Sequence, residues 1–371
     1  NNDGDNYNIG IGHSAGENVT TGTNNTLVGG LAGDALTTSG ANVAIGYQAL
    51  STEDTTGGVT AIGYQALKTQ NASSTSYNVA VGYQAGKATT TGIYNIIVGG
   101  QAGMALTTGT RNVAIGLNAL QNEDTGSHNV AIGHEALKTA DAGADAYNVA
   151  IGSKAGTAMT TGVQNTLIGG LAGDALTTGN SNVALGYAAL GTEDTGSRNI
   201  AIGRLALFNQ NNDDNNYNIA IGHNAGLSVT TGTANNLIGG LSGDALTTGV
   251  NNNVFGYNAL GATTDGIGNV AIGHSALEDQ NDGVHYNTAI GYQAGKDITT
   301  GNNTVLIGAF TGDALTTGNT NTAVGYAALS TETAGDRNVG IGYQALKNQN
   351  NTSNADIYNV AVGYEAGVSV T

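Results

Sequence analysis

Apolar and polar residues alternate in short segments that recur along the whole chain. Each segment ends at a glycine preceded by an apolar residue, first at Gly12, Gly29 and Gly46 and last at Gly363. There are 21 such marker glycines, separated by 17 residues or, less often, by 18 to 21. The residue three before each one is usually Val, Ile or Thr. Since side chains one and three before the glycine share one face of an extended segment, the pattern predicts a short strand in every repeat, which we call a coil.

The coils are grouped in a second, longer repeat. The residue four after the marker glycine follows the order Gly, Gly, Leu, Leu throughout the chain. The longer steps between marker glycines come at every fourth coil: Gly63 to Gly82, Gly133 to Gly152, Gly203 to Gly222, Gly273 to Gly291 and Gly342 to Gly363. Four coils therefore form a superunit of about 70 residues.

The pattern excludes helices and favours a solenoid. No window keeps the helical spacing of about 3.6 residues, and the Gly, Thr and Asn content opposes helix formation. Most corners contain a Thr-Gly or Asp-Gly signal, as in residues 107–109 and 124–126, where glycine supplies the backbone angles of a turn. We predict an all-β fold, a parallel β-solenoid (β-roll or β-helix) of about 21 coils. It forms one continuous array over residues 1–371 and is expected to be an internal fragment of a longer chain.

An asparagine occupies the position four before the marker glycine in 19 of the 21 coils. Val59 and Thr304 are the exceptions. So regular an amide is best explained by side chains stacked coil upon coil, each bonding its neighbour or the backbone of a turn. We interpret this asparagine as structural.

The residue two before the marker glycine is mostly alanine, as in Ala44, Ala61 and Ala80. This small face of the strand could accept another surface closely. One coil buries too little apolar surface to be stable alone. We therefore expect the alanine face to pack against other chains running in parallel, and a homotrimer is our leading hypothesis.

Composition narrows the classes of partner. The chain has 60 glycines and no proline, cysteine or tryptophan, so there is no disulfide framework. Its net charge of −17 argues against nucleic acid and anionic membranes, whose phosphates require Lys and Arg. No apolar run is long enough for a membrane span, and we expect neither a span nor a signal peptide.

The segment Asn42-Val43-Ala44-Ile45-Gly46-Tyr47-Gln48-Ala49-Leu50 resembles known repeats. It is similar to the Asn-Ser-Val-Ala-Ile-Gly repeats of trimeric autotransporter adhesin heads. It more closely resembles the Asn-Thr-Ala-Ile-Gly-Tyr-Asn-Ala-Leu arrays of phage tail fibres and bacterial surface proteins. The resemblance implies a parallel β-roll or β-helix, usually trimeric and left-handed, in an extracellular or virion fibre. The adhesin repeat is shorter, so the coil shape and the trimer contact do not transfer directly.

Two catalytic or nucleotide-binding patterns are accidents of the repeat. The segment Gly12-His13-Ser14-Ala15-Gly16 matches the G-x-S-x-G pattern of hydrolase nucleophiles. The equivalents of Ser14 are Gln84, Lys154, Asn224 and Gln293, which cannot all serve as nucleophiles. The segment Gly29–Asp34 looks like a phosphate loop but lacks the Walker spacing with lysine. We expect no catalytic and no cofactor-binding residues, and no enzyme.

Histidine and tyrosine exchange at the position directly after the marker glycine. His13, His134, His223 and His274 stand there where other coils carry tyrosine. A metal site needs fixed ligands, so we expect no metal site at these residues. The position is either a groove-filling side chain or an exposed aromatic strip that contacts glycans or other surfaces.

Acidic residues lie on successive turns. Asp34, for example, precedes Glu53-Asp54 of the next coil, and the same holds for Asp174, Asp244 and Asp313 with Glu193-Asp194, Asp265 and Glu332. Calcium could bridge such carboxylates, although no calcium-binding nonapeptide is present. The alternative is a set of solvated corners.

These features together predict a non-enzymatic structural fibre or shaft of an extracellular adhesin or filament, located at a cell surface or on a virion. It would project or form a binding surface, with cell-surface glycans as one class of partner. The first alternative is a phage tail fibre shaft for host attachment. The second is an ice-binding β-solenoid that presents the corner Thr-Thr pairs.

Overall fold

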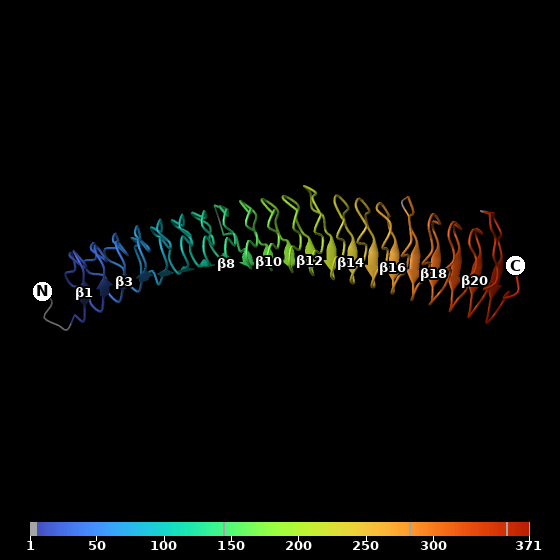
Figure 1. Cartoon of the computed structure of the whole chain (residues 1–371), viewed down its shortest axis with the longest axis horizontal. Helices are drawn as coiled ribbons and strands as arrows, with labels where there is room; N and C mark the ends of the chain where they lie inside the picture. The colour runs from blue at the N-terminus through green and yellow to red at the C-terminus, as the bar shows by residue number, and fades with distance from the viewer. Residues whose placement is uncertain (1–5, 144, 282, 354, 371) are drawn as a thin grey trace. The chain divides into compact units, whose positions relative to one another are not determined.

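The computed structural model describes residues 6–143, 145–281, 283–353 and 355–370. They fall into two units, Asn1–Asn182 and Val183–Thr371, and each unit is described by itself. In each unit every coil contributes one strand of three residues, and the loops that complete the coils rise from one side of the row of strands (Figure 1). The strands of the first unit are β1 (Ile9–Ile11), β2 (Thr26–Val28), β3 (Val43–Ile45), β4 (Thr60–Ile62), β5 (Val79–Val81), β6 (Ile96–Val98), β7 (Val113–Ile115), β8 (Val130–Ile132), β9 (Val149–Ile151) and β10 (Thr166–Ile168). Those of the second unit are β11 (Val183–Leu185), β12 (Ile200–Ile202), β13 (Ile219–Ile221), β14 (Asn236–Ile238), β15 (Asn253–Phe255), β16 (Val270–Ile272), β17 (Thr288–Ile290), β18 (Val305–Ile307), β19 (Thr322–Val324), β20 (Val339–Ile341) and β21 (Val360–Val362).

Successive strands of each unit pair in parallel, and equivalent residues face one another. In β3 and β4, for example, Val43 pairs with Thr60 and Ile45 with Ile62. The predicted all-β parallel solenoid of about 21 turns and a period near 17 residues is confirmed. The described residues contain no helix, and hence none able to cross a membrane.

The marker glycines are required by the close approach of consecutive coils. Gly116 has φ of 133°, and a Cβ atom built on it would lie 2.4 Å from the carbonyl oxygen of Gly133. Gly133, with φ of 140°, stands in the same relation to Gly152, at 2.3 Å. Any other residue would therefore be strained and would also collide with the backbone of the next coil. This explains why the glycine recurs in every coil.

The strand face that points into the coil is the alanine face. Ala44, Ala61 and Ala80 are fully buried within their own chain, whereas the Val, Ile and Thr residues on either side of them are half-buried or exposed. Our expectation that the alanine face is free to pack against another chain is therefore wrong. A coil of about 17 residues turns back on itself so tightly that its interior mostly admits small side chains opposite the returning loop. The larger Val and Ile side chains point outward.

The rest of the core lies along the returning loop. The residue three after the marker glycine, usually alanine, is buried, and the leucines four after it are buried as well. A further inward row lies seven residues after the marker glycine. In most superunits the first coil places an apolar residue in this row, and the second coil always places a leucine there, as with Val229 and Leu246. The third coil usually places a glutamate and the fourth usually a glutamine, as with Glu193 and Gln210.

Candidate functional surfaces

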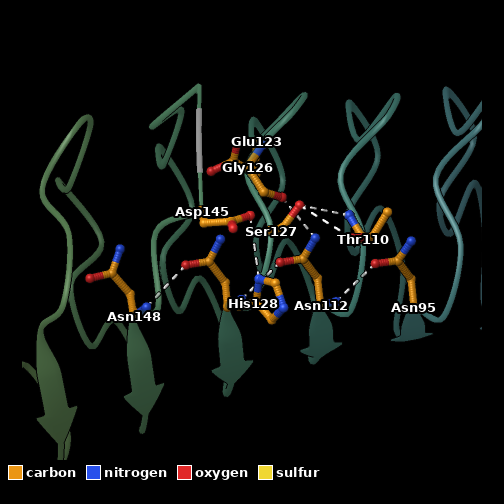
Figure 2. A network of polar contacts seen from close by, with 10 residues as sticks. Asn95, Thr110, Asn112, Glu123, Gly126, Ser127, His128, Asp145 and Asn148 are labelled. Carbon is orange, nitrogen blue, oxygen red and sulfur yellow. Dashed lines mark hydrogen bonds and ion pairs between the residues drawn. The ribbon is translucent and has the colours of Figure 1, made fainter.

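In each unit the asparagine row forms a hydrogen-bonded ladder between successive coils. The Asn95 side chain donates from Nδ2 to the carbonyl oxygen of Gly109, at 2.9 Å, and its Oδ1 accepts the backbone N–H of Asn112, also at 2.9 Å. Asn112 repeats both contacts with Gly126 and Asn129, each at 2.9 Å. Figure 2 shows these amides in one line, each just before its strand. The predicted stacking of amides, with bonds to both neighbour and turn backbone, is confirmed.

The two exceptions keep part of the ladder. At Val59 the backbone N–H still donates to Asn42 Oδ1, at 3.0 Å. At Thr304 both the backbone N–H and the hydroxyl donate to Asn287 Oδ1, each at 2.9 Å. The backbone donor is thus independent of the side chain, which is why the row tolerates either residue.

Four glutamates at the corners are fully buried: Glu53, Glu123, Glu193 and Glu332. Each stands seven residues after its marker glycine, in the inward row, and accepts a backbone N–H from three residues further on, as Glu123 does from Gly126 at 2.6 Å (Figure 2). Our interpretation of these corners as solvated is wrong for the glutamates. The signal was present in the sequence, since the same position carries Leu36 and Met159 in other coils.

Glu332 and Glu123 differ in the number of donors they face. Glu332 accepts four backbone N–H groups on Oε1 and the side-chain amides of Gln349 and Asn351 on Oε2, both at 2.8 Å. Burial alone would raise the pKa of Glu332, but these hydrogen bonds bring it below its usual value. Glu123 has only the N–H groups of Gly126 and Ala142, the second at 3.4 Å. Burial, with the nearby Asp141 and Asp124, raises the pKa of Glu123 above its usual value.

Two positions beside the carboxylate differ between these corners, although they do not alone set the pKa: Glu193 keeps Gln210 and Asn212 at these positions, and burial still raises its pKa. Ala140 stands where the other superunits carry glutamine. Ala142 stands at the same distance from Glu123 along the chain as Asn351 does from Glu332. The amide that would donate to the Glu123 carboxylate is therefore missing. The Asn129 Nδ2 atom, in the adjoining ladder, is buried without a hydrogen-bond partner.

Carboxylates cluster at a corner of the second superunit, and not at the corners that contain Asp34, Asp174, Asp244 or Asp313. Among the described residues, Glu123, Asp124 and Asp141 form the one group of three potential metal ligands, with their ligand atoms within 4.8 Å of one another. Asp34 lies near Glu17 of the preceding coil, which raises its pKa in addition to the larger effect of burial.

The aromatic residues directly after the marker glycines form stacked rows. In the first unit Tyr47 stacks on Tyr64 and Tyr64 on Tyr83, with ring centroids 5.8 and 5.3 Å apart. In the second unit His274 stacks between Tyr257 and Tyr292, at 5.4 and 5.3 Å. Histidine replaces tyrosine here because both offer a flat ring of suitable size. The tyrosine rings are about half exposed. A ring inside a row, such as Tyr64 or His274, has an aromatic neighbour on each side.

Ser14 has no special backbone geometry. Its φ of 53° is matched by 54° at Gln84 and 59° at Lys154, so the strained turn that hydrolase nucleophiles need is here a property of every coil. No pocket opens over residues 6–143, 145–281, 283–353 and 355–370.

The first threonine of most corner pairs is bonded to the next coil. The Thr107 hydroxyl donates to the carbonyl oxygen of Asp124 at 3.0 Å, and the Thr247 hydroxyl donates to that of Thr264 at 3.0 Å. The second threonine, as at Thr91 and Thr108, is exposed. One row of threonines, rather than two, is thus free to contact an external surface.

No protein-family model matches the chain, and no curated protein matches it either.

Proposed function

We propose that the chain is a non-enzymatic structural section of an extracellular fibre, belonging to an adhesin or filament that projects or forms a binding surface. The observation that carries the proposal is the asparagine ladder. Its buried amides are used to hold one coil on the next, so the recurring polar chemistry of the interior serves length and rigidity. A solenoid stabilised by nearest-neighbour contacts suits an extended spacer or scaffold.

Parallel copies of the chain would lie side by side in this fibre, and we propose three copies. Cell-surface glycans are a further proposed partner. Because a ring inside a row, such as Tyr64, has an aromatic neighbour on each side, glycans would contact its edge and hydroxyl.

The first alternative is the shaft of a phage tail fibre used in host attachment. Immunogold electron microscopy with antibodies against the chain distinguishes the cases, applied to intact cells of the source organism and to phage particles released from it. Gold along cell-surface filaments supports the adhesin or filament, and gold on tail fibres supports the alternative. Gold confined to the cell interior contradicts the fibre proposal.

An ice-binding role is the second alternative, favoured by the exposed row that includes Thr91 and Thr108. The row would present hydroxyls at the strand spacing of about 4.8 Å. A measurement of thermal hysteresis tests it directly: a freezing point depressed below the melting point supports ice binding, and coincident temperatures refute it.

A further inference from the structure

The outward face of the strands is mostly apolar and carries no charge. It consists of the residues one and three before each marker glycine, and we call it the outer face. In β7 and β8 these residues are Val113 with Ile115 and Val130 with Ile132. Along the whole chain the position one before the glycine is always Val, Ile, Leu or Phe, and the position three before it is Val, Ile, Thr or Asn.

This distribution contrasts with the rest of the chain. The protein has 27 acidic and 10 basic residues, yet none of them stands in the outer face. The aromatic position that follows each marker glycine also carries no acid, and its one fully basic residue is Arg204. The acids are therefore confined to the other surfaces of the coils.

The side chains of the outer face are accessible to solvent. Leu185 and Phe255 are each 43% exposed, and Ile96 is also 43% exposed. Each strand adds about 4.8 Å by 10 Å of surface, so the outer face of each unit, with ten or eleven strands, presents roughly 500 Å². The largest apolar patch on a typical monomer is about 300–600 Å² and is often functional, and a standard interface buries about 800 Å² per partner, so the face of one unit is of the same order as both.

We infer that the outer face is the surface through which copies of this chain associate, and that its occupant is the outer face of a second copy. Two properties select this occupant. The acids behind the net charge of −17 lie on other surfaces of the coils, so two outer faces can approach each other without repulsion between acids. A second copy also has the same strand spacing, so its ridges stay in step over many coils, whereas a surface of different period falls out of step.

The inference rests on the proposed side-by-side assembly and adds where the contact lies. It also assigns the contact between chains to the outer face instead of the alanine face, which is buried inside each chain. The outer faces of two copies would meet directly, or those of three copies would surround a common axis.

Charge placed on the outer face tests the inference. Analytical ultracentrifugation of the full chain at micromolar concentration should give an assembly of two or three copies of the 36.8 kDa chain. Ile115→Glu and Ile272→Glu should each reduce the mass toward that of one chain while the circular dichroism spectrum is kept. The control Thr91→Glu places the same charge at an exposed corner and should leave the assembly intact.

Thiol labelling keeps the test decisive if a glutamate variant does not fold. The chain has no cysteine, so Ile115→Cys and Thr91→Cys each introduce a single thiol. The thiol at position 115 should react with maleimide at least tenfold more slowly in the assembled protein than after dilution, and the thiol at position 91 should react equally in both.

Two results would overturn the inference. In the first, the full chain sediments as a single copy and the thiol at position 115 reacts equally at all concentrations, which removes the side-by-side assembly as well. In the second, an assembly forms while the thiol at position 115 stays reactive and Ile115→Glu changes nothing. The assembly then stands and another surface makes it.

Discussion

Replacing Glu332 with threonine should lower the local stability of its corner, whereas replacing Glu123 with threonine should leave the stability of its corner nearly unchanged. The chain supplies the template, because Thr263 occupies the equivalent position and accepts the N–H of Gly266 at 3.1 Å while fully buried. Threonine can therefore satisfy the corner N–H in either place. The two corners differ in the hydrogen-bond donors that are left without an acceptor after the substitution.

At Glu332→Thr two side-chain amides lose their acceptor. The backbone N–H groups of the half-buried Thr333 and Asn351 lose theirs as well, while the N–H of Ala334 keeps its bond to the carbonyl oxygen of Asn351. Gln349 is fully buried, and an unsatisfied buried donor costs about 1–3 kcal/mol. Asn351 is half-buried and can turn to water, so it adds less. We expect a total loss of about 2–4 kcal/mol at this corner.

At Glu123→Thr no side-chain amide is left without an acceptor, and one long contact with the N–H of Ala142 is lost. A buried carboxyl beside Asp124 and Asp141 is removed at the same time. We expect the stability of this corner to change by no more than about 1 kcal/mol, and in the stabilising direction above neutral pH.

Hydrogen exchange is the suitable assay, because each coil contacts only its neighbours and a damaged corner opens locally. The Gly335 amide should exchange about 30- to 800-fold faster in Glu332→Thr, since each 1.36 kcal/mol is a factor of ten. The Gly126 amide should exchange at nearly its original rate in Glu123→Thr. Equal acceleration at both corners would refute the reasoning, because it would mean that the donors around the carboxylate do not set its contribution.

The pH dependence of the two corners should have opposite signs. The folded pKa of Glu332 is lowered, so its contribution to stability is present above the pKa of the unfolded chain and is lost as pH falls through the folded pKa. The folded pKa of Glu123 is raised, so the folded corner binds its proton more tightly and loses stability as pH rises from the unfolded pKa through the folded pKa. Exchange of the Gly335 and Gly126 amides measured between pH 3 and 7 should show these opposite trends after correction for the intrinsic rate.

Four further substitutions follow from the coil geometry. Gly116→Ala should lower the melting temperature, because the new Cβ would lie 2.4 Å from a backbone oxygen, while Gly340→Ala, at a position where other coils carry alanine, should raise the free energy of unfolding by about 0.5–1 kcal/mol. Ala140→Gln should restore an amide donor beside Glu123 and lower the pKa of that carboxyl, as measured by NMR titration; an unchanged pKa would contradict the assignment of the missing donor. Tyr64→Ala interrupts a stacked row and should cost about 0.5–1.5 kcal/mol in denaturant unfolding, and a loss below 0.3 kcal/mol would show that the stacking contributes little.

Periodicity made the solenoid predictable, because a glycine recurs in every coil where the backbone of the next coil leaves no room for a side chain, and an asparagine recurs in 19 of the 21 coils. The orientation of the strand was not predictable from the same pattern. Alternation shows that Ala44 and Ile45 face opposite sides, but it does not show which side is enclosed, and the larger residue is the usual candidate for a core. Here the narrow coil reverses that preference.

The buried glutamates show a second limit. A charged residue beside Asp54 or Asp124 suggests an exposed corner, and only comparison with Leu36 and Met159 at the same place in other coils reveals an inward position. The clustering of Asp141 with Glu123 depends on how a loop of irregular length folds back, which the period does not determine. The burial of these glutamates and the clustering with Asp141 are therefore established by the three-dimensional structure.

The four coil types are not interchangeable, and this constrains how such a chain can vary in length. The inward row places a glutamate directly before a glutamine that can donate to it, as Gln349 does to Glu332 at 2.8 Å. Gain or loss of a single coil would set a buried carboxylate against an apolar neighbour and leave an amide without its acceptor. Duplication or deletion of a whole superunit keeps the order of coil types, so the usual glutamate position still comes directly before the usual glutamine position. Natural variants of this protein should therefore differ in size by steps of about 70 residues rather than about 17.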